Sequence, residues 1–153
     1  MAAMVAVTGA LTKLSLAQNE LEEEGTKAIC EALEQNTTLK ELDISGDRYG
    51  QSSIGGTAGA KHVAKMLGVN GGLTALNLSR NHLKDESVSA VCEAIQSNKE
   101  TKLASLNMSE ICMGPVGAKS VAAMVAVTGG LTSLNLSDNQ LCGLDRYGRG
   151  TYT

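Results

Sequence analysis

The stretch LTSLNLSDNQL at residues 131–141 follows the frame L-x-x-L-x-L-x-x-N-x-L. The frame recurs in full as LTALNLSRNHL at residues 73–83 and as LTKLSLAQNEL at residues 11–21. Looser copies are LKELDISGDRY at residues 39–49 and LASLNMSEICM at residues 103–113. Side chains alternate along an extended chain, so the two central leucines of each copy face the same side. Each copy therefore predicts a short strand with one apolar face.

The spacing of these copies indicates what lies between the strands. They start at Leu11, Leu39, Leu73, Leu103 and Leu131, which are 28, 34, 30 and 28 residues apart. A period near 28 residues leaves room for a helix after each strand. Frame and period together resemble the leucine-rich repeat family, and within it the ribonuclease-inhibitor-like subclass. The resemblance covers essentially the whole chain, so we expect a single leucine-rich repeat domain over residues 1–153.

The resemblance implies an α/β fold, a leucine-rich repeat solenoid (horseshoe) with a parallel β-sheet on the concave side and α-helices on the convex side. Asp85 is the expected N-cap of a helix that runs to Gln96. The helix that begins at Gly114-Pro115 is expected to turn Val121, Ala122 and Val125 inward. The inward strand positions predict a core of Leu14, Leu16, Leu42, Ile44, Leu76, Leu78, Leu106, Met108, Leu134 and Leu136.

Both ends of the chain fall in the middle of a repeat. The phrase AAMVAVTG occurs at residues 2–9 and again at residues 122–129, each time leading into a leucine frame. The first occurrence is therefore predicted to be the tail of a helix whose own strand is missing, and no helix is predicted after the last strand. A solenoid needs terminal units with a polar outer face. We therefore expect a fragment of a longer array, or ends covered by further repeats or partner chains.

Composition and motifs limit the possible functions. The net charge of −3 gives no reason to expect nucleic acid, and no apolar run is long enough for direct membrane insertion. The four cysteines lack metal-ligand spacing and are expected to be reduced thiols of a cytoplasmic protein, with Cys30 and Cys92 shielded. His62 and His82 are expected to be solvated. Since neither a catalytic triad nor a phosphate-binding loop is present, the sequence predicts a protein that is not an enzyme and needs no cofactor or metal.

Two polar columns are predicted on the concave face. One contains Ser15, Asp43, Asn77, Asn107 and Asn135, and the other contains Ala17, Ser45, Ser79, Ser109 and Ser137. The columns either bind a partner or are a solvated sheet face with ordinary small polar residues. The candidate binding residues are Asp43, Asn77, Arg80, Asn107, Asn135 and Asp138.

The tetrapeptide Asp-Arg-Tyr-Gly occurs twice, at residues 47–50 and 145–148. Both copies are expected on rim loops, which makes Arg48, Tyr49, Arg146 and Tyr147 further candidates for partner contact. Alternatively, each tyrosine folds over the open side of the core. Of the two roles, we favour the covering one.

The function that this sequence favours is that of a non-catalytic protein–protein interaction scaffold. The repeats also resemble those of Ran GTPase-activating proteins and those in the sensing ends of nucleotide-binding immune receptors. A regulator of a small GTPase is therefore the alternative function. None of the activating residues of those families maps onto this chain. A purely structural subunit of a larger assembly is the third hypothesis.

Overall fold

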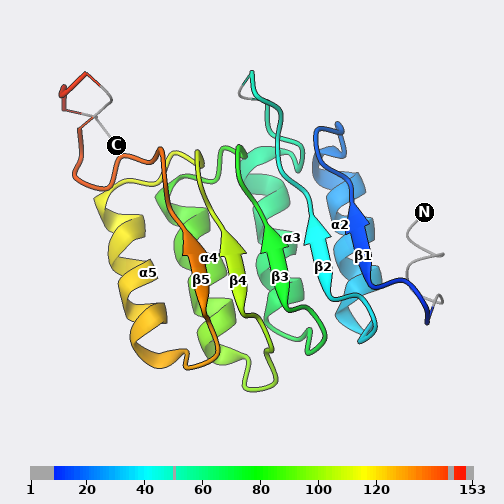
Figure 1. The fold of residues 1–153 in the computed structure, drawn as a ribbon. Helices are drawn as coiled ribbons and strands as arrows, with labels where there is room; N and C mark the ends of the chain where they lie inside the picture. The colour runs from blue at the N-terminus through cyan, green and yellow to red at the C-terminus, as the bar shows by residue number, and fades with distance from the viewer. Residues whose placement is uncertain (1–8, 50, 145–146, 151–153) are drawn as a thin grey trace.

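A computed structural model describes residues 9–49, 51–144 and 147–150 of the chain. Its centre is a sheet of five parallel strands in the order β1-β2-β3-β4-β5, which is also their order in the sequence (Figure 1). The strands are β1 (Lys13–Ser15), β2 (Glu41–Asp43), β3 (Ala75–Asn77), β4 (Ser105–Asn107) and β5 (Ser133–Asn135). Each strand lies in one copy of the leucine frame, as the sequence predicts.

Four helices connect successive strands and lie side by side behind the sheet (Figure 1). They are α2 (Glu22–Glu34), α3 (Gly56–Leu67), α4 (Lys84–Ser97) and α5 (Pro115–Val127). The predicted α/β leucine-rich repeat solenoid is therefore confirmed. The helices leave the opposite face of the sheet open, and this open face is the concave face below.

The register of the sheet places equivalent residues of every repeat in the same row. Leu14, Leu42, Leu76, Leu106 and Leu134 are paired neighbours in this register. Seven of the ten predicted core residues are buried, namely Leu16, Leu42, Ile44, Leu76, Leu78, Leu106 and Met108. Leu14, Leu134 and Leu136 are only partly buried. They lie in the two edge repeats, where a neighbouring repeat covers them on one side only.

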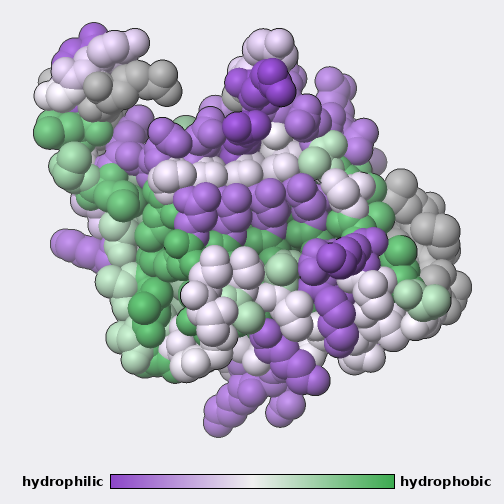
Figure 2. Space-filling model, viewed as in Figure 1, coloured by the Kyte–Doolittle hydropathy of each residue, from purple (hydrophilic) through white to green (hydrophobic). Residues whose placement is uncertain are grey.

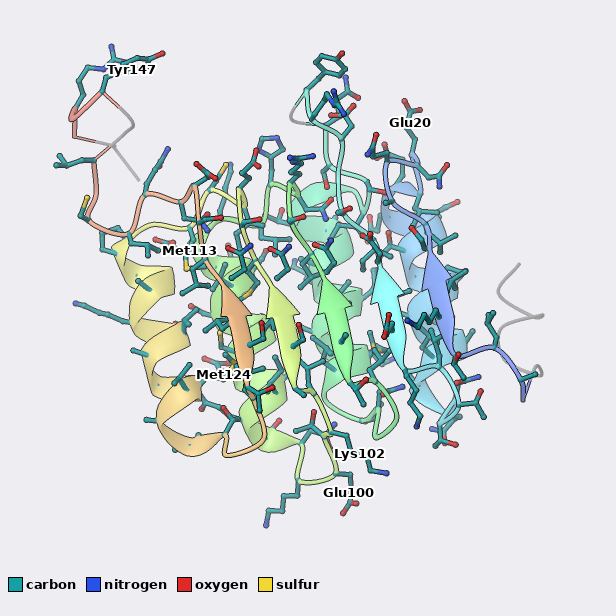
Figure 3. All side chains as sticks on the ribbon, in the orientation of Figure 1. Glu20, Glu100, Lys102, Met113, Met124 and Tyr147 are labelled. Carbon is teal, nitrogen blue, oxygen red and sulfur yellow. The ribbon has the colours of Figure 1, made fainter. Side chains whose placement is uncertain are left out.

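Helix α5 differs from the expected rotation. Val121 and Met124 are its buried apolar side chains, with Met124 fully inaccessible, whereas Ala122 is exposed and Val125 is 48% exposed. Figure 3 shows Met124 between α5 and the sheet. The expectation for Ala122 and Val125 is wrong because a long methionine placed three residues after Val121 continues the inward stripe.

The expected role of Asp85 is also wrong. Helix α4 starts at Lys84, so Asp85 lies inside its first turn rather than before it. Its Oδ1 atom accepts a hydrogen bond from the backbone N–H of Gly114, at 2.6 Å. Gly114 is the residue that precedes α5. Asp85 therefore ties the start of α4 to the start of the next helix, a contact that no single repeat reveals.

The asparagine of the frame links successive turns. The Asn81 side chain is fully buried, and its Nδ2 donates to the carbonyl oxygens of Ile44 and Leu78 at 2.9 and 3.1 Å. Its Oδ1 accepts from the backbone N–H of Ser53 at 2.8 Å. Asn139 serves the fourth repeat in the same way, since its Oδ1 accepts from the backbone N–H of Ile111 at 3.0 Å. Each of these asparagines therefore satisfies backbone groups of its own repeat and of the preceding one.

A second set of buried asparagines lies before the strands, at the opposite end from Asn81 and Asn139, and the sequence analysis does not predict it. Asn70 Nδ2 donates to the carbonyl oxygen of Leu33 at 2.7 Å, and Asn98 Nδ2 donates to that of Leu67 at 2.8 Å. These bonds satisfy the carbonyl groups at the end of the preceding helix. The available signal was an asparagine three residues before the first leucine of a frame, as at Asn36 and Asn70.

Candidate protein-binding face

The concave face carries a shallow groove of about 600 Å³ that crosses β1 to β4. Figure 2 shows a continuous hydrophilic band across the strands on this face. The groove is lined by Lys13, Leu14, Ser15, Glu41, Leu42, Asp43, Ala75, Leu76, Asn77, Ser105 and Asn107. Three of the six predicted concave-face residues, Asp43, Asn77 and Asn107, therefore lie together in one groove.

Asp43, Asn77, Asn107 and Asn135 form a row, called the amide row below. They are direct partners in the sheet register, so they lie side by side on successive strands. In each of the four residues, Oδ1 accepts a hydrogen bond from the backbone N–H two residues later, at 3.0 Å. These bonds close the end of each strand. The amide row is thus an ordered part of the fold rather than a set of freely solvated side chains.

The second predicted column contributes little to this surface. Ser45, Ser79 and Ser109 are each only 8% exposed, and their backbone N–H groups are the donors to the amide row. Of this column, Ser137 is exposed. The three buried serines are therefore structural residues rather than part of the accessible face.

Arg80 and Asp138 follow the amide row where the chain leaves β3 and β5. Both have positive φ angles, 59° and 57°, in the left-handed region. Arg80 Nε lies 3.2 Å from Glu110 Oε1 of the next repeat, with both side chains more than a third exposed. An exposed pair of this kind contributes only about 0–1 kcal/mol to stability. Asp138 is exposed above β5.

The lower wall of the groove contains an ion pair that the sequence analysis did not single out. Lys13 Nζ lies 3.2 Å from Glu41 Oε1, so the pair joins the first two strands. Both residues directly precede a central leucine of the frame, and alternation alone would have placed them on the concave face. The leucine frame therefore already indicates that Lys13 and Glu41 lie on the concave face.

The rim loops extend beyond the C-terminal ends of the strands (Figure 1). Tyr49 is 86% exposed and Tyr147 is 74% exposed, so the expected covering of the core by these tyrosines is wrong. Figure 3 shows Tyr147 at the tip of the C-terminal loop. Arg48 is exposed beside Tyr49, and none of these side chains lines the groove. Arg146 lies outside the described residues.

Contacts of Asp47 and of Arg149 lie near the tips of these loops. Asp47 Oδ1 accepts from the backbone N–H groups of Tyr49 and Gln51, each at 2.9 Å. The Arg149 guanidinium lies 5.0 Å from the centre of the Tyr147 ring, within the range of a cation–π contact. Both tyrosines are therefore exposed beside these contacts.

The thiols and histidines of the described chain lie outside the groove. Cys30 and Cys92 are buried free thiols, and burial raises the pKa of each to about 12. Cys112 is exposed, with Sγ 3.4 Å from His82 Nδ1, and partial burial raises its pKa although Lys84 opposes the shift. His62 Nε2 lies 3.3 Å from Glu23 Oε1, so this imidazole has a hydrogen-bond partner on the neighbouring helix and is only partly exposed.

Within residues 9–49, 51–144 and 147–150, no group of three histidine, cysteine, aspartate or glutamate side chains could hold a metal ion. In the same ranges, no helix combines the length and the apolar character that crossing a bilayer requires.

Comparison with known proteins agrees with this geometry. Family profiles described as leucine-rich repeat match residues 35–46 and 73–92, and residues 130–148. Human NACHT, LRR and PYD domains-containing protein 13 is 30% identical over 135 residues, which is 86% of this chain and 12% of that protein. Pig ribonuclease inhibitor is 33% identical over 130 residues, which is 84% of this chain and 27% of the inhibitor. The chain therefore spans only a small part of these relatives.

Solved structures show the same fold at low sequence identity. Leiomodin-1 actin-binding site 2 superposes with a TM-score of 0.75 and 23% identity, covering 88% of this chain and 76% of that one. The tropomodulin C-terminal domain of Caenorhabditis elegans superposes with a TM-score of 0.71 and 11% identity, covering 89% and 80%. Repeat frame, solenoid architecture and sequence relatives agree, and the chain belongs to the leucine-rich repeat proteins of the ribonuclease-inhibitor-like type.

Proposed function

We propose that this chain is a non-catalytic protein–protein interaction module that binds its partner on the concave face. The observation that carries the proposal is the groove of about 600 Å³ with its ordered amide row. Polar groups held in place before binding lose little conformational freedom when a partner docks. The relatives support this class of function, because leucine-rich repeat proteins generally bind other proteins. The ribonuclease inhibitors are named for acting on another protein.

The proposal includes a second contact surface, formed by exposed apolar side chains on the α5 side of the solenoid. Val116, Val125 and Val127 on α5 are 59%, 48% and 68% exposed, and Leu141 and Leu144 beyond β5 are 39% and 46% exposed. Figure 2 shows hydrophobic surface gathered on this side of the molecule. Apolar surface of this kind is favourable to bury. We propose that further repeats or partner chains cover it, and that residues 1–153 are one domain of a longer array.

We also place the protein in a reducing compartment such as the cytoplasm. Cys30 and Cys92 are buried as free thiols, and Cys112 and Cys142 are exposed as free thiols. Free exposed thiols are compatible with a cytosolic redox environment and would be oxidised more readily outside it.

Site-specific photo-crosslinking tests the binding face. A photoreactive side chain at Ser105, inside the groove, should crosslink a protein partner in extracts of the native cells. The matched control carries the same group at Lys61, which is exposed on α3 on the opposite side of the sheet. Crosslinks from position 105 that are absent at position 61 support the proposal. Equal crosslinking from both positions, or crosslinking from position 61 alone, would place the binding face elsewhere.

A further inference from the structure

The hydrogen bonds of the amide row determine which atoms face the groove. Asn77 and Asn107 each accept a backbone N–H at 3.0 Å, and Asn107 also accepts the Ser109 hydroxyl at 2.9 Å. A backbone N–H needs an acceptor, so the atom that it meets must be the amide oxygen and not the nitrogen. The NH₂ groups consequently point away from the strand ends. Asn135 has the same bond, from the backbone N–H of Ser137.

These NH₂ groups are available to a ligand. The structure gives the amide nitrogens of Asn77, Asn107 and Asn135 no hydrogen-bond partner among the described residues. The three side chains are equivalent in the sheet register, so their donors repeat at the spacing of the strands, about 4.8 Å. The concave face therefore presents three donor groups in a line, each in a fixed orientation.

Asp43 reverses the polarity of the row at β2. Its Oδ1 accepts the backbone N–H of Ser45 at 3.0 Å, which is the same bond that the asparagines make. The aspartate therefore fits the position without changing the backbone, and it presents a negatively charged acceptor where the other strands present donors. Glu41 on the same strand adds a second carboxylate, paired with Lys13 at 3.2 Å.

The spacing of the row distinguishes between possible partner conformations. An extended peptide lying across the strands repeats its side chains on one side only every ~6.7 Å, so its third side chain lies well beyond the third donor. On a helix, residues i, i+3, i+7 and i+10 share one face and lie at about 0, 4.5, 10.5 and 15 Å along the axis. The four row positions lie at about 0, 4.8, 9.6 and 14.4 Å. A helix therefore matches the row within about 1 Å at every position.

Charge selects the side chains of that helix. Beyond β5 the exposed Asp138 follows Asn135 by three residues, whereas Glu110 beyond β4 is paired with Arg80 at 3.2 Å. A carboxylate on the partner would be repelled there, whereas a neutral amide oxygen would not. Opposite Asp43 and Glu41, a lysine or arginine would form a charge-assisted hydrogen bond.

From this geometry we infer that the amide row recognises an α-helix of the partner protein. The helix carries glutamine or asparagine at the three positions that face Asn135, Asn107 and Asn77, and a lysine or arginine at the position that faces Asp43. This inference rests on the proposed function, because it specifies the partner of the same concave face. It makes Asp43 the residue that determines where along the row the cation is placed.

Two cross-linked helical peptides of identical composition test the inference. The first carries glutamine at i, i+3 and i+7 and lysine at i+10, and the second carries lysine at i+3 and glutamine at the other three positions. In one of the two directions of binding, the first peptide places its lysine opposite Asp43. The second peptide cannot do so in either direction when all four positions are filled, because its lysine then faces Asn77 or Asn107. Fluorescence anisotropy at low salt should show that the first peptide binds about tenfold more tightly, the ratio expected for one charge-assisted hydrogen bond.

A swap variant is the matched control. Asp43→Asn combined with Asn107→Asp keeps the net charge, and Asp43 shows that either residue accepts the backbone N–H at this position. In this variant the second peptide should become the tighter ligand. Equal affinity of the two peptides, no binding of either, or an unchanged order in the swap variant would overturn the inference. If position 105 nevertheless crosslinks a partner, the proposed function stands and only the helical partner is refuted.

Discussion

Replacing Asn81 with alanine tests how the repeats are held together. The substitution removes a fully buried amide that serves the backbone N–H of Ser53 and the carbonyl oxygens of Ile44 and Leu78. Each buried backbone group left without a partner costs about 1–3 kcal/mol. Three such groups predict a loss of about 3 kcal/mol or more in the free energy of unfolding, even where water reaches part of the space.

The matched control is Asn19→Ala, which changes the same frame position in the first repeat. Asn19 is exposed, and among the described residues it donates to the carbonyl oxygens of Leu16 and Ala17, at 3.2 and 3.4 Å. Water can replace these bonds, so the expected loss is below about 1 kcal/mol.

Urea denaturation measures both changes. A slope of about 2 kcal/mol per M converts the expected loss in Asn81→Ala into a midpoint shift of about 1.5 M, and that in Asn19→Ala into less than about 0.5 M. Equal shifts in the two variants would refute the reasoning, because the asparagine would then act within its own turn and not between repeats.

Three further predictions concern the core, the thiols and the exposed apolar surface. Leu76→Ala should lower the free energy of unfolding by about 2–5 kcal/mol, because Leu76 is only 2% exposed. Leu134→Ala should lower it by less, because Leu134 is only partly buried. The urea midpoint of Leu76→Ala should therefore be the lower of the two. Burial raises the pKa of Cys30 and Cys92 from 9.0 to about 12, so the native state keeps protons that the unfolded chain releases. Stability should therefore fall as the pH rises from about 9 to 12, and the double alanine variant should show a shallower decline. The isolated chain should self-associate at high concentration, and Val127→Lys should shift the mass from light scattering toward the monomer; a wild-type monomer at every concentration would contradict this expectation.

The parts of the fold that repeat were predictable from the sequence. Each leucine frame places two apolar side chains two residues apart, and only a strand turns both toward one core. The frame at residues 73–83 therefore predicts β3, and it predicts that Leu76 and Leu78 are buried while Asn77 faces out. The concave position of the amide row follows from the same alternation.

Interactions between repeats were not predictable in the same way. Asp85 has the sequence position of a cap for its own helix, but its carboxylate bonds to Gly114 of the next repeat. The tyrosines of the rim loops carry no periodic pattern, and both are exposed rather than folded over the core. The direction of the Asp85 side chain depends on a residue 29 positions further along the chain, which a local pattern does not contain.

The sequence by itself determined the strands, the helices between them and the leucine core, because these depend on alternation and period within one repeat. Only the tertiary structure decided which groups of the polar face are available to a partner. The oxygen atoms of Asn77 and Asn107 are occupied by backbone N–H groups, which leaves their NH₂ groups facing the groove. Hydrogen bonding is directional, so the chemical character of this surface depends on the three-dimensional placement of each donor and acceptor.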